Sequence, residues 1–228
     1  MKPFDPASLR LLVFDWDGTL MDSVATIVAC TQAVLREMEL AEVPEPTIRA
    51  TIGLGMRETI DTLIPGCTDE LFEQVIETYR SQWWTTYRDR PVLFPGVDGM
   101  LRALSAEGYL LAVATGKSRR GLDHSLDQTG LRELFHSTRT ADEAFSKPHP
   151  RMLFDILEDL GMRPHEAVMV GDTTFDLEMA RNAGTAGVGV CTGSHCREEL
   201  QELAPLVCLE RVVELPAWLA GSRAPARV

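Results

Sequence analysis

Two aspartates separated by one residue follow a short apolar run near the start of the chain. The run Leu11–Phe14 leads directly into Asp15, Trp16, Asp17 and Gly18. Carboxylates at the end of a buried strand are costly unless a positive group lies between them. The glycine allows a sharp turn there. We therefore interpret the two aspartates as a site that holds a hard cation and acts on a phosphoryl group.

Polar residues also follow two other apolar runs. Thr115 and Gly116 follow one expected strand, and Asp172 follows another. Asp176 lies four residues beyond Asp172, which is one helical turn away if a helix begins at Thr174. Because the carboxyl ends of parallel strands meet at one edge of a sheet, we expect these groups to lie near the two aspartates.

A lysine completes the set of residue types that phosphoryl transfer needs. Lys147 precedes Pro148, which we expect to open a helix whose N-terminus favours an anion. Acidic oxygens hold Mg²⁺, which prefers octahedral oxygen coordination. The metal and the lysine would neutralise a phosphate so that an anionic nucleophile, such as a carboxylate, can approach it.

The elements that would position these groups alternate between strands and helices. We expect strands at residues 11–14, 109–114, 167–170, 186–190 and 206–209. This alternation predicts an α/β fold with a Rossmann-like parallel sheet and helices on both faces. Residues 21–90 instead have the pattern of helices with no strong strand, and this insertion lies where a lid would cover the site. The expected domains are an α/β core (1–20 and 91–228) and an all-α cap (21–90).

The amino-acid composition limits which binding partners and which cellular compartment we expect. The 228 residues carry a net charge of -12, which disfavours nucleic-acid binding but permits a small anionic substrate in a locally positive pocket. The first residues lack the apolar segment of a secretory signal, and no run is long enough to cross a membrane. The five cysteines have no paired spacing, so we expect reduced thiols and a cytoplasmic location. The oligomeric state is left open, and the tail after Leu219 is expected to fray.

Four segments together resemble a known family. The segment 15–20 (DWDGTL), the strand ending in Thr115, Lys147 before Pro148, and the segment 171–176 (GDTTFD) resemble, in order, the four motifs of the haloacid dehalogenase superfamily. The insertion is similar to the family's small helical cap. The chain as a whole looks most like the phosphoglycolate phosphatase-like branch.

The resemblance implies roles for four aspartates. Asp15 would attack phosphorus and form an aspartyl-phosphate. Asp17 would protonate the leaving oxygen and then activate water. Asp15, Asp172 and the backbone carbonyl of Asp17 would bind Mg²⁺, and Asp176 would support the metal site. Asp176 could instead form only capping contacts at the start of its helix.

The resemblance also implies which residues bind the phosphate. Thr115 and Gly116 would bind its oxygens, and Lys147 would stabilise the nucleophile and the phosphoryl group. Arg57, in a glycine-bearing loop of the insertion, is either an exposed arginine in a turn or a residue that reaches the leaving group. Lys117 could add positive charge near the mouth of the site or be a solvated residue at a helix start.

The sequence therefore predicts a Mg²⁺-dependent phosphatase that hydrolyses a small phosphomonoester through an aspartyl-phosphate. The substrate would be a small phosphorylated metabolite, phosphoglycolate-like or a sugar phosphate. Two alternatives remain open, a sugar phosphomutase of the same superfamily and a phospho-acceptor signalling protein without turnover. Dehalogenases of the family lack the second aspartate of the first motif, so Asp17 argues against carbon–halogen cleavage.

Overall fold

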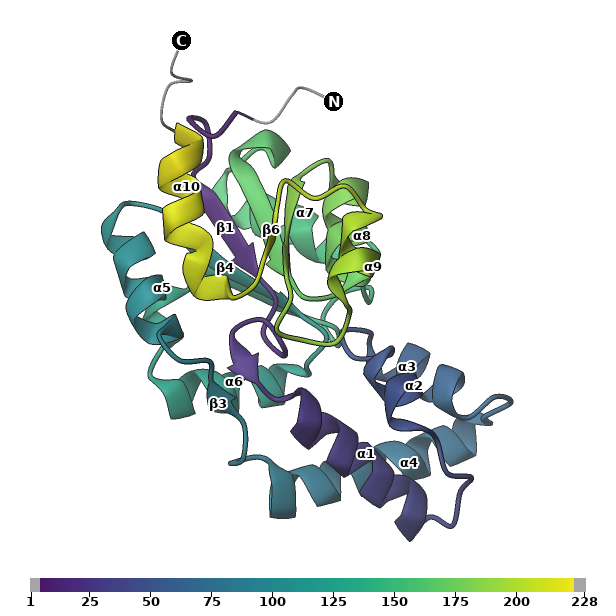
Figure 1. Ribbon diagram of the computed structural model, residues 1–228. Coiled ribbons are helices and arrows are strands. Elements are labelled where there is room, and N and C mark those ends of the chain that lie inside the picture. Colours follow the sequence, from purple (N-terminus) through teal and green to yellow (C-terminus); the bar gives the residue numbers. More distant parts are fainter. Residues whose placement is uncertain (1–4, 224–228) are drawn as a thin grey trace.

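A parallel sheet forms the centre of the computed structural model, which describes residues 5–223 (Figure 1). Within those residues the sheet has six strands in the order β5-β4-β1-β6-β7-β8. The strands are β1 (Leu11–Phe14), β4 (Leu110–Thr115), β5 (Ser137–Thr140), β6 (Ala167–Gly171), β7 (Ala186–Val190) and β8 (Cys208–Leu209). All four residues of β1 are buried, as expected for a central strand covered on both faces.

The register of the sheet brings the ends of β1 and β6 to the same level. Phe14 of β1 is aligned with Val113 of β4 and Val170 of β6. Asp15 and Asp172 therefore emerge side by side at the carboxyl ends of neighbouring strands. The chain runs outward from β1 through β4 to β5 and then returns to β6 on the other side of β1. Ligand sites of open α/β sheets lie at such a reversal of strand order.

Helices cover both faces of the sheet. They are α5 (Val97–Ala106), α6 (Arg119–Thr129), α7 (Arg151–Leu160), α8 (Thr174–Ala183), α9 (Arg197–Gln201) and α10 (Leu215–Arg223), with short 3-10 turns η2 (Arg132–Leu134), η3 (Pro164–Glu166) and η4 (Val212–Glu214). Leu12 and Phe14 pack in one apolar cluster with α5, α6 and α10, while Leu11 and Val13 pack in another with α7 and α8. The alternation of side chains along β1 thus joins the two halves of the core.

A helical segment is inserted between β1 and β4. It contains α1 (Val24–Glu37), α2 (Glu45–Arg49), α3 (Met56–Leu63), α4 (Asp69–Gln82) and a π-helical turn η1 (Trp83–Tyr87). The short antiparallel strands β2 (Met21–Asp22) and β3 (Val92–Leu93) pair where the segment leaves and rejoins the core. Its apolar side chains form clusters of their own, and Figure 1 shows the four helices grouped at one end of the molecule.

The predicted α/β class is confirmed, and the differences lie mainly at polar or terminal segments. The strand β5 was not expected, because its sequence Ser-Thr-Arg-Thr lacks an apolar run. The expected strand 206–209 is shortened to Cys208–Leu209. The tail expected to fray after Leu219 is helical as far as Arg223, and the rest of it lies outside the described residues.

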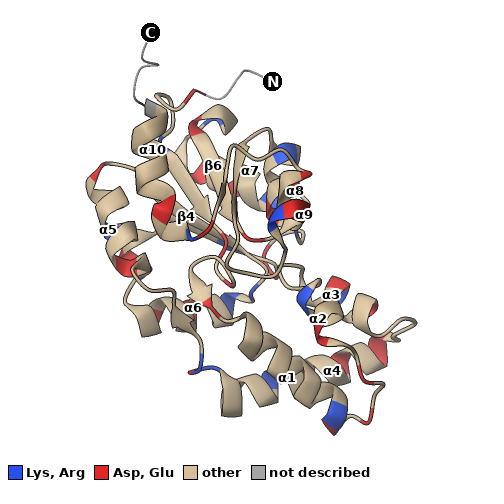
Figure 2. Ribbon diagram, viewed as in Figure 1, with Lys and Arg blue, Asp and Glu red and all other residues tan. Residues whose placement is uncertain are grey.

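Charged side chains lie mostly on the outer helices. Figure 2 shows acidic and basic residues interspersed on the helices of both the core and the insertion, whereas the central strands are largely free of them. Across residues 5–223, no helix has both the length and the apolar character that a bilayer span requires.

We expect Leu101→Ala to lower the free energy of unfolding by about 2–5 kcal/mol, because it removes a fully buried side chain from the α5 face of the core. Urea denaturation of the whole chain measures this change. The matched control is Leu206→Ala, at an exposed leucine, which should shift stability by no more than about 0.5 kcal/mol. Equal effects of the two substitutions would contradict the assignment of this core.

Candidate active site

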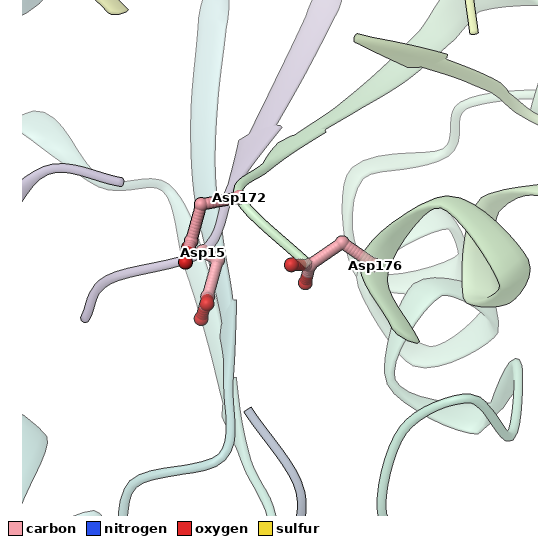
Figure 3. A group of neighbouring side chains, drawn as sticks. All are labelled: Asp15, Asp172 and Asp176. Carbon is pink, nitrogen blue, oxygen red and sulfur yellow. The ribbon is translucent and has the colours of Figure 1, made fainter. Parts of the chain in front are cut away.

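Three buried carboxylates meet at the carboxyl edge of the sheet. Asp15 follows β1, Asp172 follows β6, and Asp176 lies in the first turn of α8. Each side chain offers an oxygen within 4.8 Å of the others, and none of the three residues is more than 1% exposed. Figure 3 shows Asp15 and Asp172 together, with Asp176 directed toward them from its helix. The structure thus brings Asp15 to two aspartates that lie more than 150 positions away in the sequence.

A buried lysine lies between two of these carboxylates. The Nζ of Lys147 is 2.8 Å from Asp15 Oδ1 and 2.6 Å from Asp176 Oδ1, and the residue is 1% exposed. The ammonium therefore links the end of the central strand to the start of α8. A buried ammonium without paired carboxylates would strongly destabilise the fold, so the burial of Lys147 depends on its contacts with both aspartates.

The expected position of Lys147 immediately before a helix is wrong. The peptide bond between Lys147 and Pro148 is cis, and α7 begins only at Arg151. A residue that precedes proline is disfavoured in helical conformation, so His149 before Pro150 delays the start of the helix. The ammonium of Lys147 therefore lies in the acidic cluster and not at the N-terminus of α7.

The electrostatics of the cluster favour a divalent cation. Three carboxylates face one ammonium, which leaves a formal excess of two negative charges in a buried place. Burial raises the pKa of Asp15 to about 7, with Lys147 opposing the rise and Asp176 adding to it. Burial, followed by repulsion from Asp15 and Asp176, also raises the pKa of Asp172. Burial acts to lower the pKa of Lys147, but attraction to Asp15 and Asp176 outweighs it and raises that pKa. Carboxylate oxygens are ligands suited to Mg²⁺, so the donor set fits this ion.

Asp172 is fixed by neighbours from two loops. Thr19 Oγ1 donates a hydrogen bond to Asp172 Oδ1 at 2.8 Å, and the backbone N–H of Ser194 donates to Oδ2 at 2.8 Å. Gly18 and Gly193 pack so closely on this carboxylate that a Cβ at either position would overlap it. The loops after β1 and β7 therefore hold the side chain in one orientation.

Asp176 both caps its helix and belongs to the cluster. Its Oδ2 accepts hydrogen bonds from the backbone N–H of Thr173 at 3.1 Å and from the Thr173 hydroxyl at 2.7 Å. Its Oδ1 contacts Lys147. The two interpretations of Asp176 that the sequence left open thus describe different oxygens of one carboxylate, and its direct ligation of a metal stays a prediction.

Asp17 lies apart from the three clustered carboxylates. Both of its oxygens are 2.9 Å from Lys117 Nζ, and Ser23 Oγ donates to Oδ1 at 2.6 Å. The Lys117 side chain is 9% exposed and lies 5.3 Å from the centre of the Trp83 ring. Lys117 is therefore a partner of Asp17 and not a solvated residue. Its position two residues after Thr115 was the available sequence signal, but spacing alone does not reveal which way a loop lysine points.

Thr115 and Gly116 lie where the insertion meets the core. Thr115 is buried, and its Oγ1 accepts a hydrogen bond from the backbone N–H of Lys117 at 3.2 Å. A Cβ on Gly116 would lie 2.8 Å from the carbonyl oxygens of Gly53 and Leu54. The loop of the insertion therefore rests directly on the predicted phosphate-binding turn. Both residues line a cavity of about 520 Å³ that also contacts Asp15 and Asp17.

Arg57 lines the same cavity but has partners within the insertion. Its guanidinium pairs with Asp61 at 2.9 Å and with Asp69 at 2.7 Å, and it lies 4.7 Å above the Phe72 ring. The side chain is 44% exposed. The structure therefore holds Arg57 on the surface of the insertion, and contact with a leaving group stays a prediction.

Comparison with known proteins gives consistent matches over most of the chain. Residues 12–190 match the family described as haloacid dehalogenase-like hydrolase. The chain is 34% identical over 212 residues to "Probable phosphatase IndB" of Dickeya dadantii, covering 90% of this chain and 91% of that protein. It is 30% identical over 205 residues to the phosphoglycolate phosphatase of Psychrobacter arcticus, covering 86% and 89%. The fold matches the crystal structure of a hydrolase from Pseudomonas syringae with a TM-score of 0.85 at 24% identity, covering 93% and 98%.

The raised pKa of Asp15 generates a prediction for protein kept free of metal with a chelator. Between the ordinary value of 3.8 and about 7, the folded chain retains a proton on Asp15 that the unfolded chain releases. The stability of the wild type relative to Asp15→Asn should therefore fall as the pH rises through this window and then level off. Urea titrations of both proteins at several pH values measure the difference. A difference that stays flat or grows with pH would contradict the raised pKa.

Proposed function

The chain belongs to the haloacid dehalogenase-like hydrolase family and is a phosphatase, and on this basis we propose that it hydrolyses a small phosphomonoester with Mg²⁺ bound. The observation that carries the proposal is the buried Lys147 between Asp15 and Asp176, next to Asp172. This arrangement offers carboxylate ligands, a nucleophile and a cation at one point. The relatives named phosphatases support the reaction class, and a phosphoglycolate-like or sugar phosphate is the expected substrate class.

We assign the metal to the acidic cluster. Asp15, Asp172 and the backbone carbonyl of Asp17 would hold Mg²⁺, with Asp176 supporting the site. The formal excess of two negative charges at the cluster supports a divalent ion. When bound, the ion neutralises the charge of the incoming phosphate.

Four side chains and one backbone segment of this chain would carry out the chemistry. Asp15 attacks phosphorus, and the bond from phosphorus to the leaving oxygen breaks as Asp17 gives that oxygen a proton. Asp17 then takes a proton from the water that hydrolyses the aspartyl-phosphate. Lys147 and Thr115, with the adjacent backbone of Gly116, hold the phosphoryl oxygens in place.

The insertion would act as a lid over these groups. Its Gly53–Gly55 loop lies on Gly116, and the backbone N–H of Gly55 donates to Ser146 Oγ at 2.6 Å, one residue before Lys147. We propose that residues 21–90 close on the carboxyl edge of the sheet in this way and exclude water while the phosphoryl group is transferred.

Asp15→Asn should lower Mg²⁺-dependent phosphate release from a generic aryl phosphate by about 10³-fold or more, because it removes the nucleophile. Circular dichroism checks that the variant is folded. The matched control is Asp98→Asn, which removes an exposed carboxylate on α5 paired with Arg102 and should keep full activity. Full activity of the Asp15→Asn variant would contradict the assignment of Asp15 as the nucleophile.

Gly193→Ala should raise the Mg²⁺ concentration needed for half-maximal activity by about 10–100-fold, since the new Cβ displaces the carboxylate of Asp172. The metal dependence of phosphate release measures this change. Gly99→Ala is the matched control, because a Cβ there meets nothing within 4 Å. An unaltered metal requirement in Gly193→Ala would show that Asp172 does not take part in metal binding.

A further inference from the structure

The cavity at the carboxylates is larger than a phosphate group requires. It has a volume of about 520 Å³, which is within the usual range for sites that enclose a whole small molecule. Asp15, Asp17 and Thr115 line its phosphate end. The remaining walls come largely from the helices of the insertion, so the organic part of a substrate would meet those helices.

The walls contributed by the insertion are largely apolar. Its buried side chains form two clusters, and members of both line the cavity, among them Leu35, Ile48 and Leu63 of the first and Val34, Ile60 and Val75 of the second. Protein interiors are normally close-packed, and a space between apolar side chains forfeits contacts. An apolar group that entered this space would restore those contacts.

A stacked pair of aromatic side chains is part of the lining of the same cavity. Tyr79 and Trp83 stack with their ring centres 6.1 Å apart. Trp83 also contacts the ammonium of Lys117, which pairs with Asp17. The aromatic pair therefore continues the apolar walls up to Lys117 and its partner Asp17, which would protonate the leaving oxygen.

The charges along the cavity disfavour an anionic organic group. The cationic side chains that line it are Lys117, Arg57 and Arg80. Lys117 is paired with Asp17, and Arg57 is paired on the surface of the insertion, while Arg80 is exposed. A second carboxylate, such as that of phosphoglycolate, would lose its hydration against the apolar walls, and the lining cations available to compensate are either already paired or exposed.

We infer that the substrate is a phosphomonoester whose organic part is apolar and at least the size of a hexyl group. The phosphate occupies the acidic end of the cavity, and the organic part lies between the two apolar clusters of the insertion. This inference rests on the proposed phosphatase function but departs from the substrate class expected from the sequence, since it disfavours both phosphoglycolate and unmodified sugar phosphates.

Primary alkyl phosphates of increasing length test the inference, because their leaving groups differ little in acidity. We expect kcat/KM for hexyl phosphate to exceed that for ethyl phosphate by about tenfold or more, owing to the added buried methylenes. Hexyl phosphate should also exceed phosphoglycolate. Phosphate release without a preference for the longer chain would overturn the inference and leave the proposed function standing. Release from none of the esters would overturn both.

Two matched threonine substitutions place the apolar group within the insertion. Thr31 in α1 and Thr78 in α4 each donate a hydroxyl hydrogen bond, both at 2.9 Å, to the carbonyl four residues earlier. Thr31 lines the cavity, whereas Thr78 lies outside its lining. Thr31→Phe would fill the space and lower the ratio of hexyl to ethyl kcat/KM by about tenfold, whereas Thr78→Phe would keep both activity and ratio.

A smaller substitution and a binding measurement guard against a misfolded variant. Thr31→Leu should lower the ratio by less than Thr31→Phe. Calorimetry should also show that the wild type binds hexylphosphonate, which it cannot hydrolyse, more tightly than ethylphosphonate, and that Thr31→Phe reduces the difference. Equal binding of the two phosphonates by the wild type, or an unaltered ratio in both Thr31 variants, would refute the placement of the apolar group.

Discussion

A buried ammonium between two carboxylates is the interaction on which the remainder of the site depends. Lys147 contacts Asp15 at the end of the central strand and Asp176 at the start of α8. A buried charge without its partners is strongly destabilising, so each of the three residues constrains the position of the others. The single lysine does not balance the cluster, because Asp172 adds a further buried carboxylate. That imbalance gives a reason for the site to bind a divalent cation.

The fold meets this constraint through the topology of the sheet. Neighbouring strands β1 and β6 end at the same level, so Asp15 and Asp172 need no long loops to approach each other. Gly18 and Gly193 let the flanking loops lie directly on Asp172, and Thr19 fixes one of its oxygens. The acidic cluster therefore arises from rigid elements, while the groups that would select the substrate lie on the inserted helices.

Much of the fold could be predicted because its central elements have strong local patterns. The strand β1 is a short apolar run, and α8 begins at a threonine cap that has its acidic partner at the third helical position. The strand β5 could not be predicted in the same way, since it is polar and lies at the edge of the sheet beside β4. The start of α7 lies later than predicted, because the restriction that Pro150 imposes on the preceding residue outweighs the helix signal of Pro148.

The site was predicted less completely than the fold. Motif spacing pointed to the aspartates and to Lys147, but it did not indicate that Lys117 turns toward Asp17. Nor could the cavity be inferred, because apolar residues at helical spacing, such as Val34 and Ile76, have the pattern of an ordinary packed core. Only the folded insertion shows that side chains of both clusters line a common cavity.

Detection of the covalent intermediate tests the central claim most directly. Protein quenched in acid during turnover and treated with borohydride would carry homoserine wherever an aspartyl-phosphate had formed, and mass spectrometry of the peptides locates it. The roles assigned here predict homoserine at position 15 and an unmodified residue at position 17. Homoserine at another aspartate, or its absence during demonstrated turnover, would contradict the assignment of Asp15 as the nucleophile.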